Sequence, residues 1–68
     1  MDFYKKLGNN IKKYRLKNNL TQEELADKIG KSLNFVGKIE VAFSRPSLPT
    51  VIQIAKALNT TVSDLTKF

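Results

Sequence analysis

Apolar residues recur at helical spacing along almost the whole chain, and no segment alternates apolar and polar residues long enough to predict a strand. The first apolar set steps by four, four and three residues, and it consists of Phe3, Leu7, Ile11 and Tyr14. This spacing predicts a helix over about residues 3–18, ending at Asn18-Asn19. Gly8 lies inside that helix and is expected to weaken it, because glycine costs about 1 kcal/mol relative to alanine.

Capping signals divide the rest of the chain into four shorter helices. Their expected N-caps are Thr21, Ser32, Ser47 and Thr61. The predicted helices run over about 22–29 and 33–40, then from Ser47 to Asn59, and from Thr61 through Leu65 and Phe68. We therefore expect an all-α fold, one compact five-helix domain over residues 1–68.

Composition excludes several kinds of chemistry. The 68 residues include no Cys and no His, so the chain has no thiolate nucleophile, no imidazole acid–base group and no structural zinc ligands of those types. The few acids of the second predicted helix, Glu23, Glu24 and Asp27, are better explained by helix-start electrostatics than by catalysis. We expect no enzyme, no cofactor and no metal. No signal-peptide or membrane-length apolar run is present, so we expect a cytoplasmic protein without membrane contact.

Positive charge predicts an anionic partner. The chain has 12 basic and 6 acidic residues and a pI near 9.9, which favours nucleic acid over a membrane surface. Residues 1–20 carry six basic groups and one acid, and residues 31–45 carry three basic groups and one acid. The charge therefore belongs to the first and third predicted helices rather than to a terminal tail.

The second and third predicted helices are short and joined by a turn that contains Gly30, which is a helix-turn-helix arrangement. Ala26 is small where the two helices would cross. The apolar seam between them is expected to consist of Leu25, Ile29, Val36 and Ile39. This pattern favours DNA binding, although any small helical bundle can place Ala and Gly near a crossing.

Most of the chain resembles the lambda repressor-like helix-turn-helix family of bacterial and phage regulators, also described as Cro/cI-type or XRE-like. The matching segments are LTQEELADKIG at 20–30, Val36, Ile39-Glu40, Pro46-Ser47-Leu48 and IAKAL at 54–58. The resemblance implies a five-helix domain that binds double-stranded DNA as a transcriptional regulator, a repressor or controller. It further implies a homodimer on a two-fold symmetric operator, which either blocks RNA polymerase or contacts it.

The outer side of the recognition helix, about 32–40, is expected to lie in the major groove. The expected base contacts are Ser32, Leu33, Asn34 and Lys38. Asn34 suits a bidentate contact to adenine, Lys38 suits guanine, and Leu33 or Phe35 suits a thymine methyl. The alternative for Asn34 and Lys38 is an ordinary solvated helix face.

Other polar residues are expected to contact the DNA backbone: Gln22, Lys31, Ser44 and Arg45. Gln22 matches the family's glutamine at the start of the second helix, where free amides also bind phosphate; the alternative is a plain polar residue. For the lysines of the first helix, especially Lys5, Lys6 and Lys12, we expect only solubility and general steering. Lys13 and Lys17 are left open.

The resemblance also implies a structural ion pair between Arg15 and Glu40, a role in which arginine's bidentate geometry suits a partly buried site. Candidate dimer-interface residues are Phe43, Ile52, Leu65 and Phe68. The alternative for Leu65 and Phe68 is that they close the core of one copy, and for Leu65 this alternative is preferred.

Four positions depart from the family pattern. Val41-Ala42 replaces the usual Asn-Gly, so a left-handed turn there loses its easy residue. Phe43 replaces a common basic residue, Leu33 replaces a common polar base reader, and Gly37 lies inside the recognition helix. Gly37 permits either close approach to DNA or simple flexibility. The rival hypothesis is a protein-interaction module that has lost DNA binding, with a contact surface of Leu33, Phe35 and Phe43.

Overall fold

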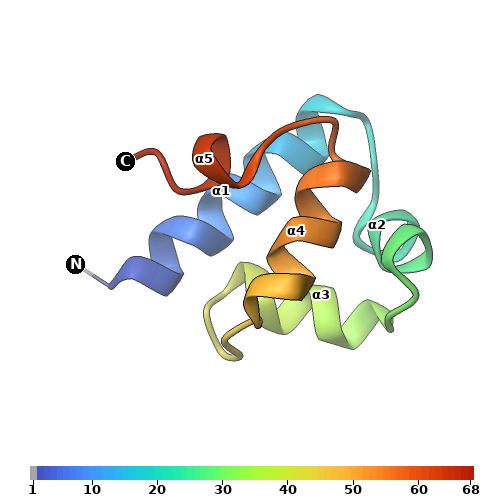
Figure 1. The fold of residues 1–68 in the computed structure, drawn as a ribbon. Coiled ribbons are helices and arrows are strands. Elements are labelled where there is room, and N and C mark those ends of the chain that lie inside the picture. Colours follow the sequence, from blue (N-terminus) through green and yellow to red (C-terminus); the bar gives the residue numbers. More distant parts are fainter. Residues whose placement is uncertain (1) are drawn as a thin grey trace.

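The computed structural model describes residues 2–68, and Met1 of the predicted 1–68 domain lies outside them. Over this range the chain forms five helices and no strand, so the all-α prediction is confirmed (Figure 1). The helices are α1 (Phe3–Lys17), α2 (Gln22–Ile29), α3 (Leu33–Glu40), α4 (Leu48–Ala57) and α5 (Val62–Leu65). The prediction that Phe68 belongs to the last helix is wrong, because α5 ends at Leu65.

Side-chain caps begin α2 to α5 at the predicted residues, and Asp2, which was not predicted, caps α1. The Thr21 hydroxyl accepts the N–H of Glu24 at 3.0 Å, and the Glu24 carboxylate accepts the N–H of Thr21 at 2.8 Å, which completes a capping box. Ser32, Ser47 and Thr61 cap α3, α4 and α5 with their hydroxyls. These bonds satisfy amides that a helix start leaves without partners, so the helix boundaries are set locally.

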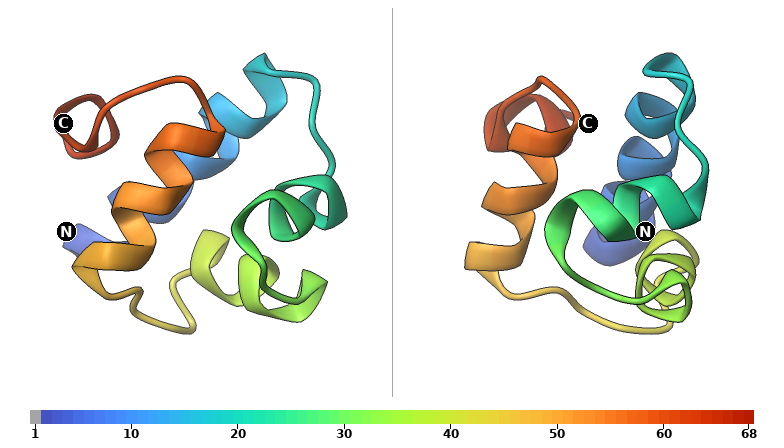
Figure 2. Two further views of the ribbon diagram at one scale, coloured as in Figure 1. Left: turned by 45° about the vertical axis from the view of Figure 1, so that its right-hand side comes forward. Right: turned by 90° about the vertical axis from the view of Figure 1, so that its right-hand side faces the viewer.

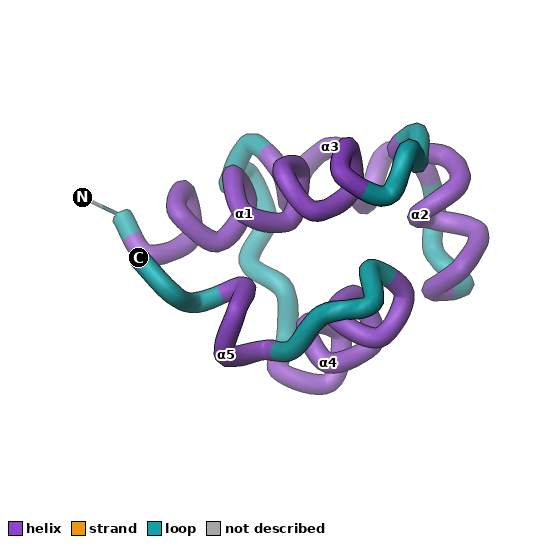
Figure 3. Tube along the Cα trace, turned by 90° about the horizontal axis from the view of Figure 1, so that it is seen from above, coloured by secondary structure: helices purple, strands orange, loops and turns teal. Residues whose placement is uncertain are grey.

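α1 and α3 lie on one side of the molecule, α4 and α5 lie on the other, and α2 closes one end (Figures 2 and 3). α2 packs against both α3 and α4, and α1 packs against both α3 and α5. Two amides tie α1 to the C-terminal half: Asn10 Nδ2 donates to the Leu65 carbonyl at 2.9 Å, and Asn18 Nδ2 donates to the Leu58 carbonyl at 3.0 Å. None of the described helices combines the length and the apolar character that crossing a bilayer requires.

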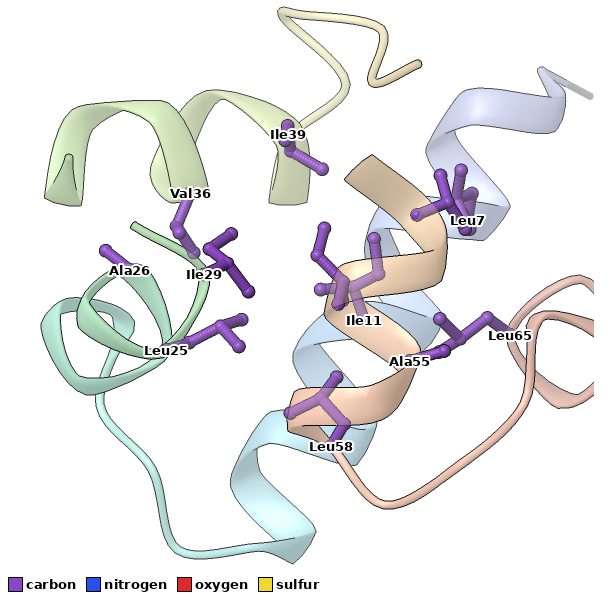
Figure 4. Packing of buried hydrophobic residues seen from close by; sticks show 12 residues of the cluster. Leu7, Ile11, Leu25, Ala26, Ile29, Val36, Ile39, Ala55, Leu58 and Leu65 are labelled. Carbon is purple, nitrogen blue, oxygen red and sulfur yellow. The ribbon is translucent and has the colours of Figure 1, made fainter. Parts of the chain in front are cut away.

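Apolar side chains from all five helices form one core (Figure 4). Its members are Leu7, Ile11, Leu25, Ala26, Ile29, Val36, Ile39, Val51, Ile54, Ala55, Leu58 and Leu65. The predicted seam between α2 and α3 is part of this core, and both helices are therefore held rigidly to the rest of the chain. Leu65 has 0% of its surface exposed, so its place among the candidate dimer-interface residues is wrong, and the preferred alternative, a residue of the core, is confirmed. It anchors α5 to the core, and a second copy could reach it only if α5 detached.

α1 and α3 cross at Gly8, which is buried. A Cβ at this position would lie 2.6 Å from the carbonyl oxygen of Ile39 and 2.7 Å from that of Glu40. The expectation that Gly8 merely weakens α1 is therefore wrong. The missing side chain lets the backbone of α1 approach the end of α3, and this approach fixes the orientation of α3.

Candidate nucleic-acid interface

α3 has one buried face and one exposed face. Val36 and Ile39 point into the core, with at most 2% of their surfaces exposed. Leu33, Asn34 and Lys38 are exposed on the other face, and Leu33 leaves half of its surface in contact with solvent. Three of the four predicted base-contacting side chains thus share one side of a helix that the core holds in place.

Ser32 and Lys31 lie at the start of α3. The Ser32 hydroxyl accepts the N–H of Phe35 at 3.1 Å, so its oxygen caps the helix while its proton remains available to an outside acceptor. The ammonium of Lys31 lies 5.4 Å from the centre of the Phe35 ring, which is only partly exposed. Both predicted contact residues are exposed beside the outer face of α3.

The loop after α3 folds back onto that helix. The amides of Phe43 and Ser44 donate to the Lys38 carbonyl at 2.8 and 3.2 Å, and the Lys38 ammonium lies 5.9 Å from the Phe43 ring centre. Ala42 makes this turn with a φ of 62°, the left-handed conformation for which the family pattern has glycine. The turn therefore forms without glycine, and the left-handed backbone of Ala42 costs about 1–2 kcal/mol of conformational free energy.

Arg15, Glu40 and Gln22 form a buried polar network that joins three helices. Arg15 donates from Nε to Glu40 Oε2 at 2.6 Å and from Nη2 to Glu40 Oε1 at 3.1 Å. Its Nη1 donates to the Leu20 carbonyl at 2.7 Å, and Gln22 Nε2 donates to Glu40 Oε1 at 3.0 Å. Arg15 and Glu40 are 6% and 5% exposed, so the Glu40 charge is compensated inside the protein. The same carboxylate orients the Gln22 amide at the first position of α2.

A hollow of about 280 Å³ opens beside Gln22. Its lining residues are Lys5, Asn9, Lys12, Gln22, Glu40 and Val41. The sequence predicts only general steering for Lys5 and Lys12 and gives no role to Asn9. Their spacing of four and three residues already indicates a shared face of α1. Which helix this face would meet depends on the tertiary fold.

Arg45 and the apolar candidates are distributed around the rest of the molecule. The Arg45 guanidinium lies 5.0 Å from the Tyr4 ring centre, so this predicted phosphate contact is held against α1. The Phe68 ring packs edge-on against Phe3 at 5.5 Å, and Phe3 and Leu48 both line an apolar groove of about 160 Å³. Leu48 and Ile52 lie one turn apart on α4. Phe43 lies in the loop between α3 and α4, is 79% exposed, and contacts Lys38 of α3.

The Glu24 carboxylate gives the start of α2 a fixed negative charge. Hydrogen bonds from the Thr21 backbone and then from its hydroxyl lower the pKa of Glu24 below the ordinary value of 4.5. The shift keeps the carboxylate ionised to lower pH than an ordinary Glu, and the carboxylate caps the N-terminal turn of α2, which carries Gln22.

Comparisons with known proteins agree with this geometry. Residues 11–65 match the model of the helix-turn-helix family. Control protein C.SmaI of Serratia marcescens is 42% identical over 65 residues, which is 96% of this chain and 77% of that protein. The restriction-modification controller protein C.AhdI of Aeromonas hydrophila superposes with a TM-score of 0.87 at 29% identity, covering 91% of this chain and 94% of that one.

A structure of SinR, described as the master regulator for biofilm formation and solved in complex with DNA, has a TM-score of 0.83 at 27% identity. That match covers 90% of this chain and 98% of the chain in that structure. The family match extends over most of the chain, and it includes the buried seam between α2 and α3 and the exposed face of α3. The chain belongs to the lambda repressor-like helix-turn-helix family.

Proposed function

We propose that this protein is a sequence-specific DNA-binding transcriptional regulator that reads the major groove with the outer face of α3. One observation carries the proposal: α3 exposes Leu33, Asn34 and Lys38 on one side while its other side is locked into the core. A rigid helix with free polar side chains meets the geometric requirement for reading base edges. The relatives add support, since one is named a control protein, another is named a restriction-modification controller protein, and a third was solved in complex with DNA.

The proposed contacts divide into two kinds. Base edges are met by Ser32, Leu33, Asn34 and Lys38, with Lys38 directed to guanine and Asn34 to adenine. Backbone phosphates are met by Gln22, Lys31, Ser44 and Arg45. For Gln22 the network with Glu40 supports this role, because an amide held in one orientation loses less conformational entropy when it binds. The Arg45 guanidinium stacks on the Tyr4 ring and is exposed, so its in-plane N–H groups can still donate to a phosphate.

The regulator is proposed to act as a homodimer on a two-fold symmetric operator. Two recognition helices about 34 Å apart would enter successive major grooves and double the number of bases read. Exposed apolar residues at and beside the apolar groove support a contact between copies. Phe3 and Leu48 line the groove, Phe68 packs against Phe3, and Ile52 lies one turn from Leu48 on α4. Bound over a promoter in the cytoplasm, such a dimer would exclude RNA polymerase or contact it.

Selection of bound duplexes from a random DNA library tests both levels of this proposal. The expected result is a consensus made of two inverted half-sites. A single half-site without symmetry would contradict the homodimer and leave the DNA reader standing. No enrichment of any sequence, with binding that only falls as salt rises, would contradict sequence-specific recognition.

A protein-binding surface is the second candidate function. Phe43 is 79% exposed and Val41 is 71% exposed, both next to the outer face of α3. Apolar side chains this open are typical of contacts with another protein. This function would be favoured if duplexes of every sequence were ignored at low ionic strength.

A further inference from the structure

We propose that the hollow between α1 and the start of α2 binds phosphates of the DNA backbone through Lys5 and Lys12. The inference rests on the proposed function, in which α3 occupies the major groove. It extends the DNA contact surface from α3 and α2 to α1, and it gives two lysines a specific role in place of general steering.

The position of the hollow beside α3 is the first support. Gln22 lines it, and the Gln22 amide oxygen lies 3.7 Å from where a Cβ of Gly37 would be, so the hollow abuts α3. Val41, the residue that caps the end of α3, lines it too and is 71% exposed. A helix seated in the major groove is flanked by phosphate backbones, and the groove is only about 12 Å wide. The backbone on the Gln22 side would therefore pass over this hollow.

The state of the charges is the second support. Among residues 2–68, ion pairs join Arg15 to Glu40 and Lys67 to Asp64, so neither involves Lys5 or Lys12. The one carboxylate in the wall, Glu40, accepts two bonds from Arg15 and one from Gln22. Its charge is compensated, so the hollow presents two ammonium groups and the Asn9 amide to an anion.

A second hollow on the molecule provides a matched comparison. It measures about 470 Å³ and also contains two lysines, Lys28 and Lys56. Its walls come from the end of α2, from α4 and from Asn59, which follows α4. None of the residues that line this second hollow belongs to α3. Both lysine pairs are exposed, and replacing either pair with alanine removes the same amount of positive charge. Only the first pair borders the proposed DNA-binding face.

The experiment compares Lys5→Ala/Lys12→Ala with Lys28→Ala/Lys56→Ala. Binding to a mixed-sequence duplex of roughly 30 bp, about three helical turns, is titrated between about 50 and 200 mM salt. Loss of two phosphate contacts should reduce the slope of log K against log salt by about 1.8 for each bound copy. Affinity near 0.1 M salt should fall on the order of 10–100-fold. The Lys28/Lys56 pair should keep the wild-type slope, and Lys5→Arg/Lys12→Arg should restore it.

The outcomes separate this inference from the proposed function. Equal slope losses for the two alanine pairs would mean that net charge alone matters and would overturn the site. A Lys5/Lys12 variant that keeps the wild-type slope would overturn it as well, while DNA binding itself would stand. Wild-type protein that ignores the duplex at the lowest salt would overturn both. Thermal melts of each variant should match wild type, since the four lysines are exposed.

Discussion

The two faces of α3 differ in what determines their residues. On the inner face each residue has a partner within the protein: Val36 and Ile39 fill the core, and Glu40 holds Arg15 and Gln22. On the outer face Leu33 is half exposed, and Gly37 sits in mid-helix although a Cβ there would lie no closer than 3.7 Å to another helix, at the Gln22 amide oxygen of α2. Contacts within the protein therefore determine which residues stand on the inner face of α3. The residues on the outer face are free to be determined by contacts with a ligand.

The largest expected effect lies on the inner face, at Glu40. Glu40→Ala leaves the Arg15 guanidinium buried without its carboxylate, and such losses cost about 3–5 kcal/mol. DNA binding should weaken because less of the chain is folded. Urea and thermal unfolding measure the change. An unchanged melting temperature would contradict the structural role assigned to this pair.

Gly8→Ala should be the next largest change, because it tests the contact that α1 makes with the inner side of α3. The added Cβ would meet two carbonyl oxygens of the backbone at 2.6 and 2.7 Å, and these cannot rotate away. We expect a loss of about 1–3 kcal/mol, despite the better helix propensity of alanine. Denaturant unfolding would show it, and a variant more stable than wild type would mean that the helices do not cross this closely.

The same substitution on the outer face should have the opposite sign. Gly37→Ala places its Cβ in ordinary contact with the Gln22 amide, so the protein should gain up to about 1 kcal/mol from helix propensity. If the missing side chain serves close approach to DNA, affinity for duplex should fall while stability rises. Parallel melts and DNA titrations measure the two quantities. If Gly37→Ala were less stable than wild type, the predicted opposite signs of the stability change at Gly8 and Gly37 would be contradicted.

The smallest expected effect lies away from both faces of α3, in the capping box of α2. Thr21 lowers the pKa of Glu24, so the resulting stabilisation is complete above the unfolded value of 4.5 and disappears as pH falls through the lower folded value. Glu24→Gln keeps a capping side chain but removes the titration. Melting temperatures measured from roughly pH 6 to pH 3 should therefore fall less steeply in the variant. Identical slopes would contradict the assignment.

Local features of the fold and the apolar seam between α2 and α3 were predictable from sequence, whereas the close backbone approach of α1 to α3 at Gly8 was not. Thr21, Ser32 and Ser47 begin helices because each side chain bonds amides within three residues, which sequence spacing reveals. Gly8 was misjudged because the atoms that a side chain there would meet belong to residues more than thirty positions away. Leu65 lies in the core, as the preferred alternative has it.

Within the candidate interface the same division holds. The outer face of α3 follows from periodicity once Val36 and Ile39 are placed in the core, and the contact of Arg15 with Glu40 was implied by the family resemblance. The hollow that joins Lys5 and Lys12 to Gln22 depends on how α1 lies against α2 and α3. The spacing of Lys5 and Lys12 along α1 shows that they share one face of the helix, but it does not show which helices that face meets.

The central claim is that DNA, and not the protein, specifies the outer face of α3. Lys38→Ala tests it most directly when its melting temperature and its base preferences in a random-library selection are measured together. We predict a stability change below about 1 kcal/mol, limited to its contact with the Phe43 ring, and loss of preference at one base pair per half-site worth about 1–3 kcal/mol. A destabilised variant that selects the wild-type consensus would contradict the claim.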